Sequence, residues 1–87
     1  MTYRIEIVRV ARKQMLSLPR PAQLAVAKAI DRLANIPRPP KCKKLRGAEL
    51  WRLKLERYRV VYTVDDKSKL VTVVKVAVRR EDTYQGL

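Results

Sequence analysis

The sequence contains no histidine and no phenylalanine, and cysteine occurs once, at Cys42. A lone cysteine cannot form an internal disulfide, and no cluster of His and Cys residues suggests a metal site. Without histidine, no side chain has an ordinary pKa near neutrality. Mechanisms that rely on Ser–His, Cys–His or a pair of histidines are therefore excluded. Acid–base chemistry would have to use Lys, Tyr, Arg or a carboxylate.

Long apolar runs are also missing. No stretch approaches the roughly 18 apolar residues of a membrane span. The N-terminal stretch MTYRIEIVRV alternates and is too charged for the apolar part of a signal peptide. We therefore expect a cytoplasmic protein with no membrane partner, which fits a single reduced cysteine. The 87 residues are enough for one domain, residues 1–87.

Positive charge is the most prominent feature that is present. The chain has 21 Lys and Arg residues against 8 Asp and Glu residues, a net charge of +13. Such an excess attracts polyanions, so nucleic acid is the first candidate partner and an acidic protein the second. An anionic membrane ranks third, because the longest expected helix is not notably basic. We expect no cofactor and no small-molecule substrate.

Hydrophobic periodicity predicts an α+β domain that begins with one strand and two helices. Residues 3–10 alternate as a half-buried strand, and residues 10–18 place apolar side chains at helical spacing until Pro19 stops the helix. A second helix should start near Pro21 and run to about residue 35. Because few residues separate the two helices, we expect an antiparallel hairpin that packs on one face of a sheet.

The second half of the chain reads as three strands. Residues 36–44 contain three prolines and should form a loop, followed by strands at 50–55, 58–64 and 69–78. The last strand is apolar on both faces and is expected in the sheet centre, beside the N-terminal strand. The predicted order is β-α-α-β-β-β, with a four-stranded, antiparallel-type sheet. The helices would cover one face, and cations would line the other.

The hairpin in residues 50–64 can be read in register. If Glu56 and Arg57 form the turn, the cross-strand pairs are Leu55–Tyr58, Lys54–Arg59, Leu53–Val60 and Trp51–Tyr62. The aromatic residues then belong to the apolar face and the core. Glu-Arg is a poor type I′ turn, however, and a longer loop would move one set of side chains to the other face. On strict alternation, the last strand would put Val71, Val73 and Ala77 on one face and Leu70, Val74, Val76 and Val78 on the other.

The polar face of this hairpin carries Arg52, Lys54 and Arg59, which repel one another unless an anion lies among them. Neighbouring cations favour the neutral form of Lys54, whereas arginine stays protonated. Lys54 is thus the one plausible base in a cationic site, a combination suited to phosphodiester cleavage. Two other interpretations stay open at this point, a merely solvated face and nucleic-acid binding without chemistry.

Two residues near the C-terminus are less determined. Tyr84 lies in a polar tail and could stack on a base or pack on the sheet edge. A strict two-residue turn at Asp66-Lys67 would put Arg79 on the face away from Arg59. An odd offset in that loop, or a twist at the strand end, would bring it back.

The runs LRGAELWRLKLERYRVVYTVDD and VVKVAVRREDTY resemble the RelE/ParE superfamily of bacterial and archaeal toxins, and the resemblance covers essentially the whole chain. It implies a compact fold of the microbial-ribonuclease-like kind, partnered by a small acidic antitoxin. For the RelE branch it further implies a metal-independent endoribonuclease that cleaves mRNA in the ribosomal A site and contacts ribosomal RNA.

The resemblance also assigns roles. Arg52 and Lys54 match the paired basic positions, Arg59 the phosphate-binding arginine, Arg79 the arginine after the last strand, and Tyr84 the C-terminal tyrosine. Lys54 would deprotonate the 2′-hydroxyl, because the first basic position, often Lys, is Arg here. Arg52 and Arg59 would hold the scissile phosphate, Arg79 would assist the leaving 5′-oxygen, and Tyr84 would orient a base.

Two alternatives to an mRNA-cleaving toxin remain. The ParE branch inhibits DNA gyrase through protein–protein contact and generally lacks this set of cations. A non-catalytic nucleic-acid-binding domain is the other. Branches of the superfamily that use a Glu/His pair are disfavoured because the chain has no histidine.

Overall fold

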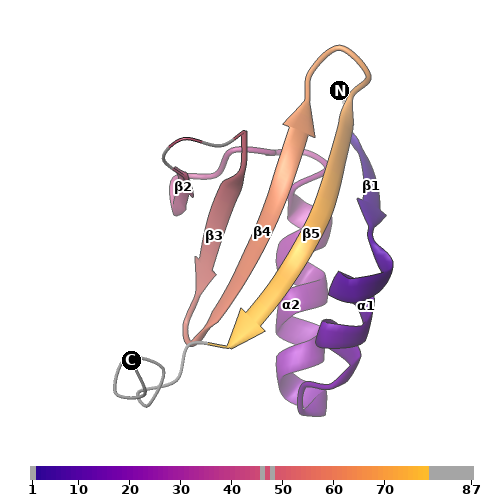
Figure 1. Ribbon diagram of the computed structural model, residues 1–87, viewed down its shortest axis with the longest axis vertical. Coiled ribbons are helices and arrows are strands. Elements are labelled where there is room, and N and C mark those ends of the chain that lie inside the picture. The colour runs from indigo at the N-terminus through magenta and orange to yellow at the C-terminus, as the bar shows by residue number, and fades with distance from the viewer. Residues whose placement is uncertain (1, 46, 48, 79–87) are drawn as a thin grey trace.

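The computed structural model describes residues 2–45, 47 and 49–78, which form a single sheet flanked by helices (Figure 1). Within these residues, the strands are β1 (Arg4–Ile7), β2 (Cys42–Lys44), β3 (Trp51–Leu55), β4 (Tyr58–Asp65) and β5 (Leu70–Val78), and the helices are α1 (Arg9–Leu16) and α2 (Arg20–Arg32). The strand order across the sheet is β1-β5-β4-β3-β2. The predicted α+β class, with two helices between the first strand and the rest, is confirmed.

The sheet differs from the expected one in two details. The described residues form five strands rather than four, because β2 at the end of the proline-containing segment pairs with β3 in antiparallel fashion. The first strand does lie beside the last one, but β1 and β5 run parallel, from Arg4 opposite Leu70 to Ile7 opposite Val73. A parallel pair needs a long crossover connection, and both helices lie in the connection that follows β1.

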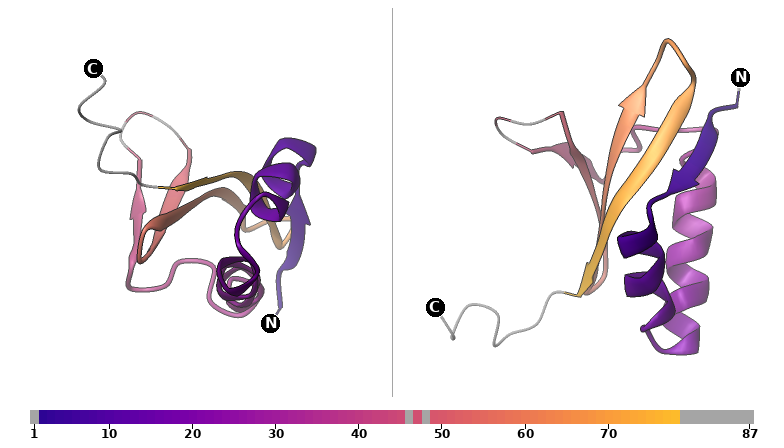
Figure 2. Two further views of the ribbon diagram at one scale, coloured as in Figure 1. Left: turned by 90° about the horizontal axis from the view of Figure 1, so that it is seen from below. Right: turned by 45° about the vertical axis from the view of Figure 1, so that its right-hand side comes forward.

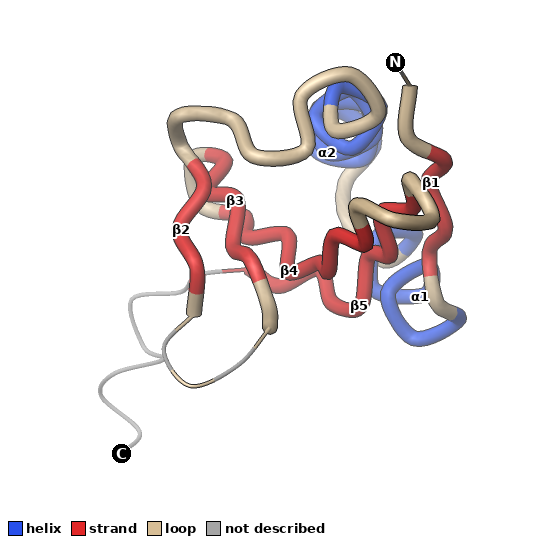
Figure 3. The backbone as a smooth tube through the Cα atoms, turned by 90° about the horizontal axis from the view of Figure 1, so that it is seen from above, coloured by secondary structure: helices blue, strands red, loops and turns tan. Residues whose placement is uncertain are grey.

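The two helices occupy different places against the sheet. Helix α2 lies across one face, whereas α1 lies along the edge of β5 just beyond the end of β1 (Figures 2 and 3). There the side-chain oxygen of Gln14 accepts a 2.8 Å hydrogen bond from the backbone N–H of Val76. Such a bond satisfies a donor that the short β1 leaves free at the sheet edge. The expectation that both helices would cover one face therefore describes α2, but not α1.

The core lies between α2 and the sheet. Helix α2 contributes Val26 and Ile30, which are almost fully buried, and Leu33, just after the helix, is buried as well. Tyr62 is also fully buried, and its hydroxyl donates a 2.8 Å hydrogen bond to the carbonyl oxygen of Pro37. Burial raises the pKa of the Tyr62 hydroxyl above its ordinary value. Tyr62 is thus a core residue as predicted, and Trp51 and Tyr58 pack against the same core.

A β-bulge at Val74 changes the faces of β5. Tyr62 lies opposite Val73, but its neighbour Val61 lies opposite Lys75, so Val74 is an extra residue in β5. One extra residue reverses the alternation of the strand from that point on. Strict alternation was therefore the wrong prediction here: Val76 and Val78 share the core face with Val71 and Val73, and Ala77 faces the other way.

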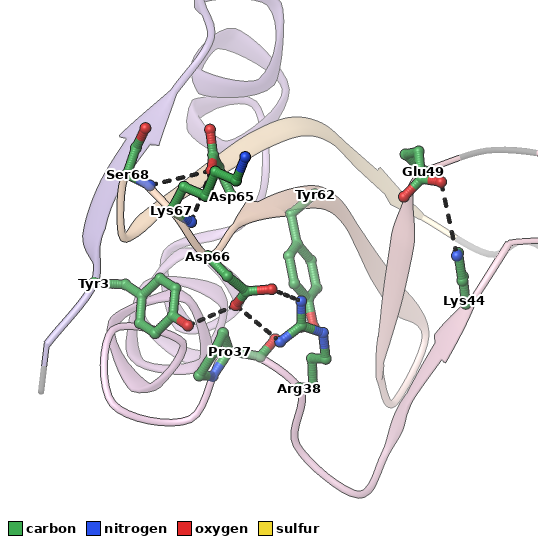
Figure 4. A network of polar contacts seen from close by, with 10 residues as sticks. All are labelled: Tyr3, Pro37, Arg38, Lys44, Glu49, Tyr62, Asp65, Asp66, Lys67 and Ser68. Carbon is green, nitrogen blue, oxygen red and sulfur yellow. Dashed lines mark hydrogen bonds and ion pairs between the residues drawn. The ribbon is translucent and has the colours of Figure 1, made fainter.

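A polar network ties the β4–β5 turn to the rest of the molecule (Figure 4). The carboxylate of Asp66 accepts hydrogen bonds from the Tyr3 hydroxyl at 2.6 Å and from the Arg38 guanidinium at 2.8 and 3.3 Å. Arg38 in turn lies over the ring of Trp51, 5.2 Å from its centroid. The bonds from Arg38 and then from Tyr3 lower the pKa of Asp66 to about 2. The network therefore joins the start of β1, the segment after α2, and β3.

None of the helices in the described ranges is both long and apolar enough to cross a membrane.

Candidate functional site

Five basic residues face away from α2 on strands β2 to β5, and we call this set the cationic face. Cross-strand partners share a face of a sheet, and successive residues of a strand alternate between faces. Since Leu53, Val60 and Tyr62 point into the core, their neighbours on β3 and β4 point outward. The register then gives the members of the cationic face: Lys43, Arg52, Lys54, Arg59 and Lys75.

The β3–β4 hairpin has the register that the sequence predicted. Leu55 lies opposite Tyr58, Lys54 opposite Arg59, Leu53 opposite Val60 and Trp51 opposite Tyr62. The unfavourable Glu-Arg turn is tolerated because Glu56 takes a positive φ of 55°. A left-handed residue lets a two-residue loop follow the twist of the strands, at a local cost of about 1 kcal/mol. The hairpin thus places Lys54 beside Arg59 without a shift.

The cationic face is arranged in two rows across the sheet. In the first row, Lys54 of β3 is followed by Arg59 of β4 and Ala77 of β5. The second row runs from β2 to β5 through Lys43, Arg52, Val61 and Lys75. The rows are two residues apart along each strand, which corresponds to about 6.7 Å. The short side chains of Ala77 and Val61 leave space between the cations on β5 and β4.

No carboxylate of the described residues neutralises this face. The two ion pairs among the described residues lie away from the cationic face, between Arg38 and Asp66 and between Lys44 and Glu49. Arg52 and Arg59 are half-buried and Lys54 is exposed, so their charges are accessible but crowded. By register, the outward-facing carboxylates Glu6 and Asp65 lie in the next two rows beyond Lys75, with Glu6 opposite Thr72 and Asp65 opposite Leu70. The arrangement can therefore hold an anionic group such as a phosphate.

A metal-dependent site is not visible in the described part of the chain. No group of three or more His, Cys, Asp or Glu side chains lies close enough to hold an ion there. The hairpin part of the cationic face instead offers the amine of Lys54 beside the guanidinium groups of Arg52 and Arg59, which stay charged. Together these groups can bind a phosphodiester and stabilise charge that develops on it.

Three of the five residues predicted for the site are brought together, namely Arg52, Lys54 and Arg59. Arg79 and Tyr84 lie outside the described residues. Within the described residues, the bulge puts Ala77 opposite Arg59 on the cationic face.

Sequence reasoning missed two members of the cationic face. Lys43 was assigned to a loop, and Lys75 to a strand considered only for its apolar residues. A signal for Lys75 did exist, because it is the single charged residue in the stretch LVTVVKVAV. Its direction could not be read from the sequence, since it depends on the bulge at Val74.

The chain is similar to known toxins in sequence and in fold. A family model described as the ParE toxin of the type II toxin–antitoxin system, parDE, matches residues 5–83. A chain of the archaeal RelE–RelB complex from Pyrococcus horikoshii OT3 has a TM-score of 0.82 and 32% identity, covering 93% of this chain and 99% of that chain.

Bacterial structures are similar to the chain as well. A chain of the toxin–antitoxin complex RelBE2 from Mycobacterium tuberculosis has a TM-score of 0.82 and 26% identity, covering 91% of this chain and 100% of that chain. The isolated E. coli RelE toxin has a TM-score of 0.79 and 27% identity, covering 97% of this chain and 93% of that chain. No curated protein is similar enough in sequence to count as a match.

Proposed function

We propose that this chain, which belongs to the ParE toxin family of type II toxin–antitoxin systems within the RelE/ParE superfamily, is a toxin that cleaves mRNA on the ribosome. The observation that carries this proposal is the pairing of Lys54 with Arg59, with Arg52 on the same face. The similarity to solved RelE toxins supports it. Such a toxin would act in the cytoplasm, where translating ribosomes are found.

The proposed reaction needs only groups of this chain and the RNA. The neutral amine of Lys54 takes the proton of a 2′-hydroxyl, and the 2′-oxygen attacks the neighbouring phosphorus. The bond from phosphorus to the 5′-oxygen breaks, which leaves a 2′,3′-cyclic phosphate and, after protonation, a 5′-hydroxyl. Arg52 and Arg59 stabilise the charge on the phosphoryl oxygens. We assign Arg79 to the leaving oxygen and Tyr84 to stacking on a base, from the resemblance alone.

Dependence on the ribosome follows from the weakness of this chemistry. A lysine base surrounded by arginines, with no histidine to donate or accept protons, supplies little acid–base power. Holding the reacting groups in the right geometry can replace much of that power. We therefore propose that the ribosome orients the mRNA, and that the basic surface of the toxin, with its net charge of +13, contacts ribosomal RNA.

The partner that restrains the toxin should be a small acidic antitoxin. The solved relatives include complexes with RelB antitoxins. A carboxylate-rich segment laid over the cationic face would neutralise Arg52, Lys54 and Arg59 and exclude RNA from them. We propose that neutralisation works in this way.

Inhibition of DNA gyrase is the second candidate function, because the matching family model is named for ParE. A gyrase inhibitor would act by protein–protein contact and would need no base. The exposed amine of Lys54 among arginines has no role in that mechanism, and this favours RNA cleavage. A nucleic-acid-binding domain without catalysis would use the same cations but leave RNA intact.

These functions can be separated by assaying the purified toxin on programmed ribosomes and on purified gyrase. The proposal predicts cuts in the mRNA at the ribosomal A site with wild-type protein and with Lys28→Gln, which removes a charge from exposed α2 surface. Lys54→Gln should give no cuts. Intact mRNA together with trapped gyrase–DNA cleavage complexes would replace the proposal with the gyrase function. Intact mRNA with salt-sensitive RNA binding would leave only a binding domain.

A further inference from the structure

Lys75 stands on the cationic face because of the bulge at Val74. Lys75 lies opposite Val61 of β4, and Val61 in turn lies opposite Arg52 of β3. Val76, two residues after the bulge, donates its backbone N–H to Gln14 and so joins this part of β5 to α1. A contact with another element therefore lies close to the bulge that turns Lys75 outward.

The position of Lys75 relative to Arg59 suits two neighbouring phosphates. Arg59 lies opposite Ala77, so Lys75 is its diagonal neighbour, two residues along the adjacent strand. Diagonal neighbours have Cα atoms about 7–8 Å apart, within reach of long side chains. Consecutive phosphates of a single RNA strand are spaced by a similar distance. Lys75 is also exposed, and no described carboxylate forms an ion pair with it.

Between β4 and β5, the cross-strand neighbours of Arg59 and Lys75 are uncharged. The residue opposite Arg59 is an alanine and the residue opposite Lys75 is a valine, and both face outward. Their side chains are uncharged and shorter than those of Arg59 and Lys75. A backbone that lies over Ala77 and Val61 would contact both cations at once.

We propose that Lys75 binds the phosphate adjacent to the scissile one and thereby positions the RNA, so that the correct 2′-hydroxyl lies over Lys54. The RNA strand then passes from the first row of the cationic face to the second. Lys75 is a positioning residue in this arrangement, since it touches a neighbouring phosphate and takes no part in bond making. The inference rests on the proposed function for the reaction, but the second phosphate position can be tested without it.

The test combines Lys75→Gln with RNA whose phosphates are neutralised one at a time as methylphosphonates. With wild-type toxin on programmed ribosomes, neutralising one particular phosphate beside the scissile bond should slow single-turnover cleavage about 10-fold or more. Lys75→Gln should cleave unmodified mRNA slowly, and its cleavage rate should not fall further when that phosphate is neutralised. Lys28→Gln, which makes the same charge change on α2, should keep the full penalty. A merely structural role for Lys75 would leave the penalty in place.

Two results overturn the inference while leaving the proposed function intact. One is a Lys75→Gln variant that cleaves as wild type does, and the other is a variant that keeps the methylphosphonate penalty. If the wild-type protein cuts no RNA at all, the proposed function fails. The second phosphate position is then tested by measuring RNA binding. In fluorescence anisotropy with a short single-stranded RNA, Lys75→Gln should reduce the slope of log affinity against log salt by about 0.7, the value for one phosphate contact. An unchanged slope overturns the second phosphate position.

Discussion

Lys54 and Arg59 lie directly opposite each other on β3 and β4, and both point away from the core. Like charges in this position destabilise a sheet by about 0.2–1 kcal/mol. We propose that these cations bind a phosphate, and they can do so only if both stay in place. The repulsion is therefore a stability cost of the site, and it can be measured.

Removing the repulsion should stabilise the fold. We expect Lys54→Gln to raise the free energy of unfolding by about 0.2–1 kcal/mol at low salt, measured by urea denaturation. The gain should shrink at 0.5 M salt, because salt screens exposed charges. Lys28→Gln reports how lowering the net charge of +13 in general changes the free energy of unfolding, and this change must be subtracted from that of Lys54→Gln. Equal gains for the two variants would mean that Lys54 and Arg59 do not repel each other measurably.

The identity of the base can be tested without changing the charge. Lys54→Arg keeps a cation opposite Arg59 but cannot release a proton near neutral pH. We expect its single-turnover cleavage rate on ribosomes to fall about 10²- to 10⁴-fold, the usual contribution of a general base. Binding to ribosomes should stay close to that of the wild type. Near-normal cleavage by Lys54→Arg would assign the base to another group.

The hydrogen bond between Gln14 and Val76 should contribute to stability. Replacing Gln14 by Ala leaves the partly buried N–H of Val76 without its acceptor, which costs about 1–3 kcal/mol. Gln14→Glu keeps an acceptor oxygen at the same place and should lose less. Urea midpoints at unchanged m-value give the comparison. A Gln14→Ala variant as stable as the wild type would show that β5 does not need this bond.

Acid should weaken the network around Asp66. Hydrogen bonds from Arg38 and Tyr3 hold the pKa of Asp66 at about 2, below its ordinary value of 3.8. The folded state therefore favours the carboxylate, so the contribution is complete above about pH 4 and is lost as the pH falls through about 2. We expect the stability difference between wild type and Asp66→Asn to shrink from pH 5 to pH 2, measured by urea midpoints.

A second carboxylate provides the control for that experiment. Asp31→Asn makes the same change on the exposed surface of α2, away from Arg38 and Tyr3. Its stability difference from the wild type should change less over the same range. If the two variants behave alike between pH 5 and pH 2, the network does not depend on the charge of Asp66.

Much of the candidate site could be predicted from the sequence because its key contacts are local. Lys54 and Arg59 are five residues apart in one hairpin, and a two-residue turn fixes their pairing. The apolar partners Leu53 and Val60 hold this register, because a slip by one residue would expose them. Binary patterning therefore sufficed for Arg52, Lys54 and Arg59, even though the turn residues Glu56 and Arg57 were unfavourable.

By itself, then, the sequence determined the α+β class, the buried stripe of α2 and the cationic face of the β3–β4 hairpin, since each follows from side-chain periodicity. Only the tertiary structure decided that β2 joins the sheet, that α1 lies at its edge, and that Lys75 shares a face with Arg59. The reason is that such features depend on contacts between distant residues, as when Val76, two residues after the bulge at Val74, bonds Gln14, 62 positions away in the chain. No local pattern records a hydrogen bond between residues so far apart.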